Sequence, residues 1–301
     1  MPELNEGQGF ESTSKWQGIL QEVEEAQREA ASNGEVIWYR GQAVADWLVR
    51  SSLHRHVIDI FESTGIHFAE GNQAFLRDEY KTIYRKFKAH AWHLLDPIER
   101  NDWGIIFKMQ HYGFPTRLLD WTKSFACALF FAQWDRKRED DAVIYLLNPE
   151  SLNEVSLGRR GYIALDDNSG LGNIDVRLYH PRWAAPISDL PTIAVFPFLS
   201  NPRMVAQRAA FTLSGDSFFP LDEQFEGRLR DKGYIRRIVL PADTFDEAER
   251  FLNFVGAGSY EYFPDLEGLR IAHKAETKKV LQTAKHYLAT RKHSQEPSEK
   301  E

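Results

Sequence analysis

Apolar residues recur at helical spacing in the N-terminal part of the chain. In residues 14–32 this spacing begins beside Thr13 or Ser14, residue types that cap helix starts, and stops before Gly34, a residue type that ends helices. The same spacing returns over residues 70–95 and 101–112. We therefore predict three helices in this part of the chain.

The remaining apolar segments are shorter and are separated by turn residues. Strands are predicted at residues 35–41, 142–148, 192–199, 208–213 and 234–241. Helices are predicted at residues 124–135, 246–255 and 265–290. Residues 114–122 are expected to be extended or irregular, residues 47–56 give no clear pattern, and residues 150–190 form a loop-rich insertion containing many Gly, Asp, Asn and Pro.

These elements indicate one mixed α+β domain without internal repeats. We divide the chain into a helical lead, residues 1–33, and a main domain, residues 34–290, which contains the loop-rich insertion. The polar residues 291–301 are expected to be disordered.

Composition and charge narrow the functional classes. The chain has 301 residues, 43% of them hydrophobic and 27% charged, as in ordinary globular proteins. Its net charge of −7 argues against tight nucleic-acid binding unless a local basic patch forms. No signal peptide and no apolar stretch long enough for a membrane span is visible, so we expect a cytoplasmic protein without membrane contact. The single cysteine, Cys127, lies in the apolar run "FACALFFA" and is predicted to fill the core.

Three segments place polar residues among apolar ones at predicted element ends, where binding sites are commonly built. They are "VIWYRGQAVADWLVRSSLHR" at residues 36–55, "MQHYGFPTRLLDWTKSFACALFFA" at residues 109–132 and "NPRMVAQRAAFTLSG" at residues 201–215. In the first, Arg40 follows a predicted strand, where burying a guanidinium demands a partner.

The three segments resemble the FRG domain, a mainly bacterial family with an aromatic-Arg-Gly motif. Here the motif is Tyr39-Arg40-Gly41. "QHYGFPTRLLDWT" followed by "ALFFA" is similar to the second family block, and "NPRMVAQRAAFTL" to the third. "YFPDLEGL" at residues 262–269 resembles the family ending, so the resemblance covers about residues 34–275.

A further resemblance is to arginine-type ADP-ribosyltransferases. Their three motifs correspond here to residues 39–41, 120–132 and 206–211, with Gln207 where the enzymes carry a strand Glu. This resemblance implies a split, antiparallel-rich central sheet flanked by helices and NAD as the substrate. It assigns cofactor binding to Tyr39, Arg40, Gly41, Tyr112, Arg117, Trp121 and Thr122, and catalysis to Gln207, His111 and Asp120.

The resemblance also implies how these residues would act. Arg40 would bind the diphosphate, with Gly41 allowing a close backbone approach. Tyr39, Tyr112 and Trp121, together with His111, would offer flat faces to the rings of NAD. Gln207 would hydrogen-bond a ribose hydroxyl in the transition state. Because a neutral amide cannot stabilise a developing cation as a carboxylate does, that task would pass to Asp120 or Glu261.

Purely structural alternatives remain for each position. Arg40 would pair with Asp120, or Arg117 would pair with Asp120 to order a loop. Thr122 or Ser124 would cap the helix at residues 124–135. His111 would be a hydrogen-bonded core or rim residue. The histidines His54, His56, His90 and His93 lack supporting ligands at suitable spacing, so no metal site is predicted.

Three functional hypotheses follow. The first is an NAD-using ADP-ribosyltransferase or NAD-consuming effector in bacterial stress or phage defence, with a macromolecular acceptor or an activating partner. The second is a module that senses a nucleotide or another phosphate ligand without turnover. The third is a nuclease-like toxin, against which the acidic balance argues.

Overall fold

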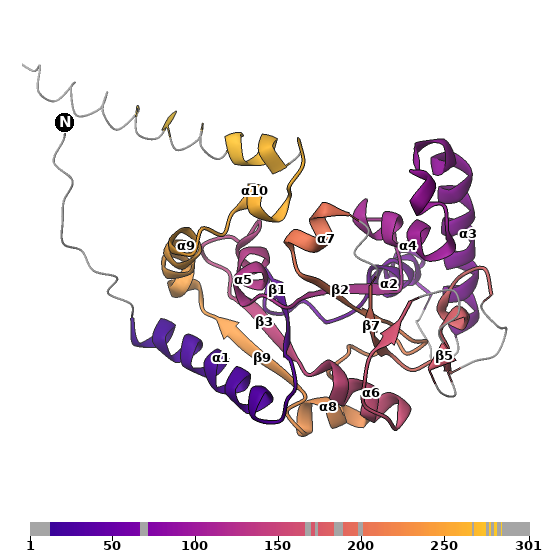
Figure 1. Ribbon diagram of the computed structural model, residues 1–301, viewed down its shortest axis with the longest axis horizontal. Helices are drawn as coiled ribbons and strands as arrows, with labels where there is room; N and C mark the ends of the chain where they lie inside the picture. The colour runs from indigo at the N-terminus through magenta and orange to yellow at the C-terminus, as the bar shows by residue number, and fades with distance from the viewer. Residues whose placement is uncertain are drawn as a thin grey trace, which may run out of the picture.

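A mixed sheet with helices on both faces forms the centre of the molecule in the computed structural model (Figure 1). The structure describes residues 13–66, 72–165, 170–171, 174–183, 189–197, 201–266, 268–274, 277, 280–281 and 284. The mixed α+β class predicted from the sequence is confirmed within these residues.

The α-helices alternate irregularly with the strands along the chain. They are α1 (Ser14–Ser32), α2 (Ser52–Thr64), α3 (Gln73–Ala91), α4 (Asp102–His111), α5 (Phe125–Gln133), α6 (Pro149–Leu157), α7 (Pro202–Ala206), α8 (Arg228–Asp231), α9 (Phe245–Phe254) and α10 (Ser259–Tyr262). Short 3-10 helices are η1 (Trp92–Leu94), η2 (Pro97–Glu99), η3 (Val176–Tyr179), η4 (Phe225–Gly227) and η5 (Ala242–Thr244).

The strands build a seven-stranded sheet in the order β4-β7-β8-β2-β1-β3-β9 and a separate small pair, β5-β6, within the described residues. They are β1 (Trp38–Gln42), β2 (Leu118–Thr122), β3 (Ala142–Leu147), β4 (Ile163–Ala164), β5 (Gly170–Leu171), β6 (Ile174–Asp175), β7 (Ile193–Phe196), β8 (Ala209–Leu213) and β9 (Ile235–Leu240). Only β4 and β7 pair in parallel within the large sheet, so the predicted antiparallel-rich sheet is confirmed there.

The two strands at the centre of the sheet pair over only a short length. β1 and β2 share a single register pair, Tyr39 with Thr122. By contrast, β1 pairs with β3 over five positions, and β2 pairs with β8 over five. The sheet is therefore split between β1 and β2, although its seven strands still form one sheet.

Three apolar clusters cover the sheet. One face packs against α6 and α8 through a cluster that spans both sides of the split, with members on β1, β2, β3, β7 and β8. The opposite face carries two separate clusters. One joins α1, α5 and α9 to β1, β3 and β9, and we call these three helices the α5 lobe. The other joins α2, α3 and α4 to β2, β7 and β8, and we call these helices the α2–α4 lobe.

The helices with clear sequence periodicity form close to their predicted limits. The side chain of Thr13 accepts a hydrogen bond from the Trp16 backbone N–H and caps α1, whose buried face packs in the α5 lobe. The predicted helix at residues 70–95 is shorter, because α3 ends at Ala91 and a 3-10 turn follows. Of the helix predicted at residues 265–290, residues 268–274 are helical; much of the remainder, and the tail 291–301, lie outside the described residues.

Five helices, α2, α6, α7, α8 and α10, occupy segments for which the sequence predicted none. α2 lies in the segment without clear periodicity, because the polar His54 takes a buried position on its apolar face beside Leu53 and Val57. α6 replaces the start of the expected loop-rich insertion. Asn148 accepts a hydrogen bond from the Ser151 backbone N–H at 3.0 Å and caps it, and Gly158, with φ 69°, ends it.

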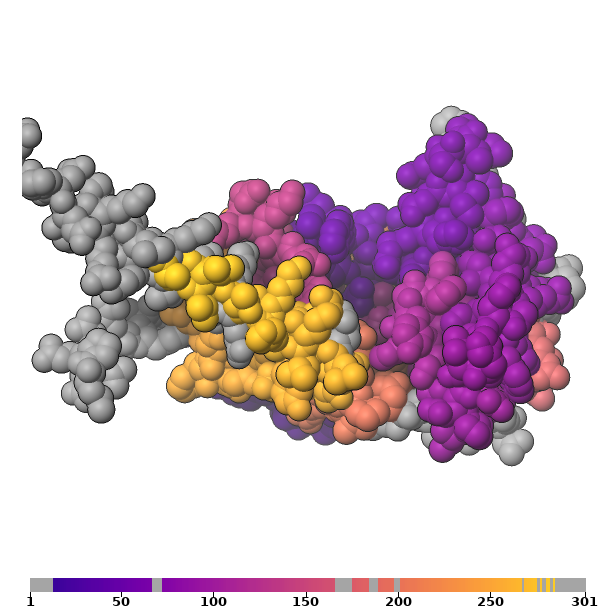
Figure 2. All heavy atoms as spheres, turned by 90° about the horizontal axis from the view of Figure 1, so that it is seen from above, coloured from indigo at the N-terminus to yellow at the C-terminus, as the bar shows by residue number. Residues whose placement is uncertain are grey.

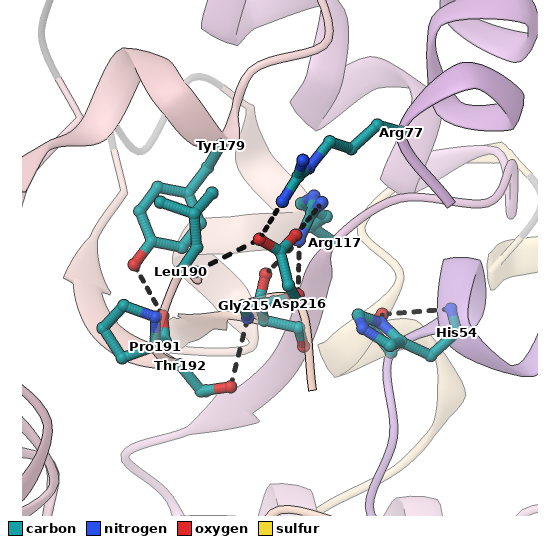
Figure 3. Close-up of polar contacts among 11 residues, drawn as sticks. His54, Arg77, Arg117, Tyr179, Leu190, Pro191, Thr192, Gly215 and Asp216 are labelled. Carbon is teal, nitrogen blue, oxygen red and sulfur yellow. Dashed lines mark hydrogen bonds and ion pairs between the residues drawn. The ribbon is translucent and has the colours of Figure 1, made fainter. Parts of the chain in front are cut away.

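A buried charged cluster fastens the α2–α4 lobe to the sheet (Figure 3). The carboxylate of the fully buried Asp216 accepts a hydrogen bond from Arg77 Nη2 on α3 at 2.6 Å. It accepts another from Arg117 Nη2, just before β2, at 2.8 Å. The Leu190 backbone N–H donates to the same carboxylate at 3.1 Å. Although burial raises the pKa of Asp216, the charge of Arg117 and the hydrogen bonds from Arg77, Arg117 and Leu190 outweigh burial and hold that pKa below its ordinary value.

Candidate functional site

A cleft of about 850 Å³ opens between the two lobes, over the split in the sheet. Figure 2 shows this face of the molecule hollowed between the purple residues of the α2–α4 lobe and the orange-to-yellow C-terminal part. The cleft is lined by β1, the loop after it and α2, by the end of α4 and by β2, α5 and α7. The three segments singled out in the sequence therefore converge on one cavity.

Arg40 bridges the split. Its Nη1 donates to the Asp120 backbone carbonyl on β2 at 2.8 Å, and its Nε donates to Gln42 Oε1 at 3.2 Å. No carboxylate lies within ion-pair distance of Arg40 among the described residues, and its Nη2 has no protein partner there. Burial lowers the pKa of Arg40 to about 10, so the guanidinium stays charged at neutral pH.

Arg40 is one of four arginines that line the cleft without a carboxylate partner within the described part of the chain. The others are Arg50, Arg55 and Arg203. Arg55 Nη1 donates to the Arg50 carbonyl at 2.6 Å, and the Arg203 guanidinium lies 4.3 Å from the centre of the Phe263 ring. Burial lowers the pKa of each of these three side chains. Unpaired guanidinium groups in a cavity are suited to an anionic ligand.

Asp120 lies on β2 with its side chain exposed to the cleft. Its Oδ2 accepts a hydrogen bond from Gln110 Nε2 on α4 at 2.6 Å. The carboxylate is therefore held in place by a neutral donor, while the backbone carbonyl of the same residue holds Arg40. The predicted Arg40–Asp120 contact exists, but it is made to the backbone rather than to the carboxylate.

Gln207 closes α7 instead of lying in a strand, as the resemblance had implied, because β8 begins only at Ala209. Its Nε2 donates to the Tyr262 carbonyl at 3.0 Å. Its own backbone carbonyl accepts a hydrogen bond from Thr122 Oγ1 at 2.6 Å, which ties β2 to the end of α7. The cleft lining includes both Gln207 and Thr122.

His111 is the last residue of α4 and also lines the cleft. Burial lowers its pKa, and the nearby positive charges of Arg203 and Lys108 lower it further. The imidazole is consequently neutral at neutral pH, which is the form that accepts a proton.

Two aromatic residues of the motifs belong to the cleft lining, but their rings are packed into apolar clusters. The Tyr39 ring is 2% exposed and accepts a hydrogen bond from Gln27 Nε2 at 2.7 Å within the α5 lobe. The Trp121 ring is buried on the opposite face and donates to Thr212 Oγ1 at 3.1 Å. Neither ring offers a free face to a ligand, so the predicted stacking roles of these two residues do not fit the structure.

Gly41 is required by helix packing. A Cβ atom built on Gly41 would lie 1.8 Å from the Ala128 carbonyl oxygen of α5. The strand and the helix therefore approach each other with no space for a side chain. Gly41 also lines the cleft, so its predicted role in a close ligand approach stays a prediction beside this backbone contact.

Tyr112 and Arg117 are the two predicted binding residues that lie outside the cleft lining. Tyr112 is 63% exposed beyond the end of α4. Arg117 is buried in the Asp216 cluster and does not order a loop by pairing with Asp120. It lies three positions from Asp120 along extended backbone, so the two side chains point to opposite faces. Glu261 on α10 is exposed and is also absent from the cleft lining.

The remaining candidates have structural partners. Ser124 caps α5 by accepting from the Cys127 backbone N–H at 3.3 Å, and Cys127 is buried, which raises its pKa to about 12. His54 Nδ1 lies 2.7 Å from Ser51 Oγ, and His56 Nε2 lies 3.2 Å from Glu79 Oε1. In the described ranges no group of three or more His, Cys, Asp or Glu side chains is arranged to hold a metal ion.

The sequence reasoning missed several residues of the cleft. Arg50, Arg55, Arg203 and Trp47 are not singled out by the sequence, although all four line the cleft and Trp47 is 56% exposed. The three arginines lie inside the motif segments, so the number of arginines there was a sequence signal for a positively charged cleft. The sequence around Trp47 gave no such signal, because the exposure of this side chain depends on how its loop folds.

Comparisons with known proteins identify one related family. No curated protein and no solved structure matches the chain. No helix among the described residues is both long and apolar enough to cross a membrane. Residues 35–141, which supply β1, α2, α3, α4, β2 and α5 and thus most of the cleft, match the family model of the FRG domain.

Proposed function

We propose that the cleft binds NAD and that the protein is an NAD-consuming enzyme of the ADP-ribosyltransferase type. The observation that carries the proposal is the position of Arg40: a charged guanidinium at the split of the sheet, with a free Nη2 and no carboxylate partner among the described residues. A diphosphate supplies the anionic oxygens that such a group binds. The cavity volume of about 850 Å³ lies within the range of small-molecule and cofactor sites.

The charges of the cleft favour NAD over a simple polyphosphate. Its lining combines the four arginines with carboxylates, including Asp120, Asp59 and Glu62. NAD is itself dipolar, with an anionic diphosphate and a cationic nicotinamide ring. We infer that the diphosphate lies at Arg40 and the cationic ring near Asp120, because opposite charges are then paired at both ends.

The proposed reaction breaks the bond between nicotinamide and ribose C1′. Nicotinamide leaves with the bonding electron pair, and the positive charge that develops on the ribose is stabilised by the Asp120 carboxylate. A nucleophile, either water or an acceptor group, then forms the new bond to C1′. Its proton passes to His111, whose lowered pKa keeps it neutral and able to accept.

A second candidate function is nucleotide sensing without turnover. The observation that favours it is Gln207, which offers no carboxylate and whose Nε2 is held by the Tyr262 carbonyl. A ligand in the cleft would contact α7 through this residue, and binding would be communicated to α10 without chemistry.

Binding and turnover are tested separately. NAD titrated into the wild-type protein in a calorimeter should bind, and Arg40→Ala should weaken binding at least about tenfold, because a charge-assisted hydrogen bond is lost. Arg138→Ala is the matched control, since that arginine pairs with Asp246 at an exposed site. Nicotinamide release, followed with and without cell lysate, reports turnover.

The outcomes distinguish the two candidates. Absence of NAD binding by the wild type removes the NAD-consuming enzyme and removes NAD as the sensed nucleotide. Binding without nicotinamide release under any condition removes the enzyme and leaves the sensor. Equal loss of binding in Arg40→Ala and Arg138→Ala would show that Arg40 has no specific role.

A further inference from the structure

The loop between β1 and α2 forms one wall of the cleft and carries an exposed tryptophan. Trp47 lies in this loop, is 56% exposed and belongs to the cleft lining. The other aromatic side chains that line the cleft in the described part of the chain are buried or half-buried against protein. Trp47 is therefore the ring most accessible to a ligand.

The backbone of the loop is anchored by hydrogen bonds although its tryptophan is exposed. At Ala45 the backbone N–H donates to the Asp141 carbonyl at 2.7 Å, and the carbonyl accepts from Arg237 Nη2 at 2.9 Å. The Val49 carbonyl accepts from the Leu221 backbone N–H at 3.0 Å. These bonds anchor both ends of the loop to the body of the protein. A rigid aromatic side chain loses little conformational entropy when a ligand stacks on it.

Gln42 links this loop to Arg40. Its side chain is 5% exposed; its Oε1 accepts from Arg40 Nε at 3.2 Å, and its Nε2 donates to the Trp47 carbonyl at 2.7 Å. One amide therefore positions the guanidinium and the tryptophan loop relative to each other. The arrangement is suited to a ligand that has an anionic group and a flat ring a fixed distance apart.

We propose that Trp47 is the stacking platform for the adenine base of the bound nucleotide and that Gln42 is the residue that positions it relative to Arg40. The inference rests on the proposed function, which places the nicotinamide end at Asp120 and leaves the adenine end to the loop wall. It adds the ligand class: an adenine nucleotide with at least one phosphate, recognised by base and phosphate together.

The test uses ADP, which has the base, and inorganic pyrophosphate, which lacks it. In calorimetric titrations Trp47→Ala should bind ADP about tenfold more weakly and bind pyrophosphate as the wild type does, because only the stacking is lost. Trp47→Phe should retain most of the ADP affinity. Arg40→Ala should weaken both ligands. The matched control is Trp92→Ala, since Trp92 is 42% exposed and absent from the cleft lining.

Tryptophan fluorescence provides a second measurement. Quenching by ADP in the wild type should be largely lost in Trp47→Phe while binding persists, because the stacked indole is the one that reports the ligand. Trp92→Phe should leave the quenching unchanged.

Three other outcomes of these titrations would contradict the stacking role of Trp47 or the proposed function. Unchanged ADP affinity in Trp47→Ala, with weaker binding in Arg40→Ala, overturns the stacking role and leaves the proposed function intact. Equal weakening of ADP and pyrophosphate in Trp47→Ala overturns it as well, because the loop would then act only structurally. If the wild type binds neither NAD, ADP nor pyrophosphate, the proposed function and this inference fall together.

Discussion

The charged guanidinium of Arg40 donates a hydrogen bond to a backbone carbonyl and not to a carboxylate. An ion pair with a carboxylate would have neutralised the guanidinium, whereas the Asp120 carbonyl and the Gln42 amide orient it and leave its charge in place. Because the partner on β2 is main chain, replacing the Asp120 side chain leaves the contact intact. The charge and the geometry of Arg40 are therefore set independently of the carboxylate beside it.

The missing carboxylate at position 207 leads to a prediction at the residue scale. In Gln207→Glu we expect nicotinamide release from NAD to rise at least about tenfold, because a carboxylate stabilises the positive charge that develops on the ribose. The gain should be accompanied by a loss of about 1–3 kcal/mol in the free energy of unfolding, since the Tyr262 carbonyl loses its donor.

Gln224→Glu is the matched control for this substitution. Gln224 is buried outside the cleft, and its Nε2 also donates to a backbone carbonyl, that of Phe219, at 2.8 Å. It should lose stability by a similar amount and show no change in nicotinamide release. A folded Gln207→Glu protein with unchanged release contradicts the prediction.

At the scale of elements, the contact between β1 and α5 fixes the wall of the cleft. Gly41 permits this contact, because an added Cβ would overlap the Ala128 carbonyl oxygen. The helix cannot move away from the strand without disturbing the cluster of the α5 lobe, to which Tyr39 and Leu129 belong. Position 41 is thus a structural requirement within a motif that also serves the site.

Gly41→Ala should lower the free energy of unfolding by about 1–3 kcal/mol or more, because overpacking displaces the strand from the helix. Urea denaturation measures the effect. Gly18→Ala is the control: Gly18 is exposed on α1 with nothing within 4 Å of the added Cβ, so there the substitution should stabilise the helix. Equal effects at both positions would contradict a packing role for Gly41.

Elements whose apolar spacing is local were predictable from the sequence. β3 is buried along all six residues, and its continuous apolar run predicts that. α2 was missed because the buried His54 breaks the apolar pattern. The convergence of the three motif segments was also accessible, since each lies at an element end.

The directions of individual side chains were not accessible from the sequence. Tyr39 and Trp121 belong to the cleft lining, yet strand alternation and register turn their rings into the core. Arg117 pairs with Asp216, which lies 99 residues further along the chain, so local sequence cannot reveal the pair. The exposure of Trp47 likewise depends on a loop held by distant contacts.

At the scale of the whole molecule, buried neutral histidines make stability depend on pH. Burial lowers the pKa of His54 to about 3 and that of His180 to about 4. The unfolded chain binds protons on these groups already near pH 6.5, so it is favoured as the pH falls. Both groups contribute stability that is present at neutral pH and decreases below about pH 6.5.

The free energy of unfolding should therefore fall by about 1.4 kcal/mol per pH unit for each histidine between about pH 6 and pH 4. Denaturant titrations at several pH values measure the slope. His54→Gln should reduce the slope by the contribution of one group. A slope identical to that of the wild type would show that His54 is not held neutral in the folded protein.

The single backbone pair between β1 and β2 has a consequence for how the molecule moves. The two lobes rest on separate clusters above the sheet, while one cluster beneath it spans both halves. We expect this shared cluster to act as a hinge, so that the halves tilt apart above it without unfolding. A bound molecule that joins Arg40 on one half to α4 or α7 on the other would clamp them. Ligand affinity would then depend on the rigidity of the hinge as well as on contacts in the cleft.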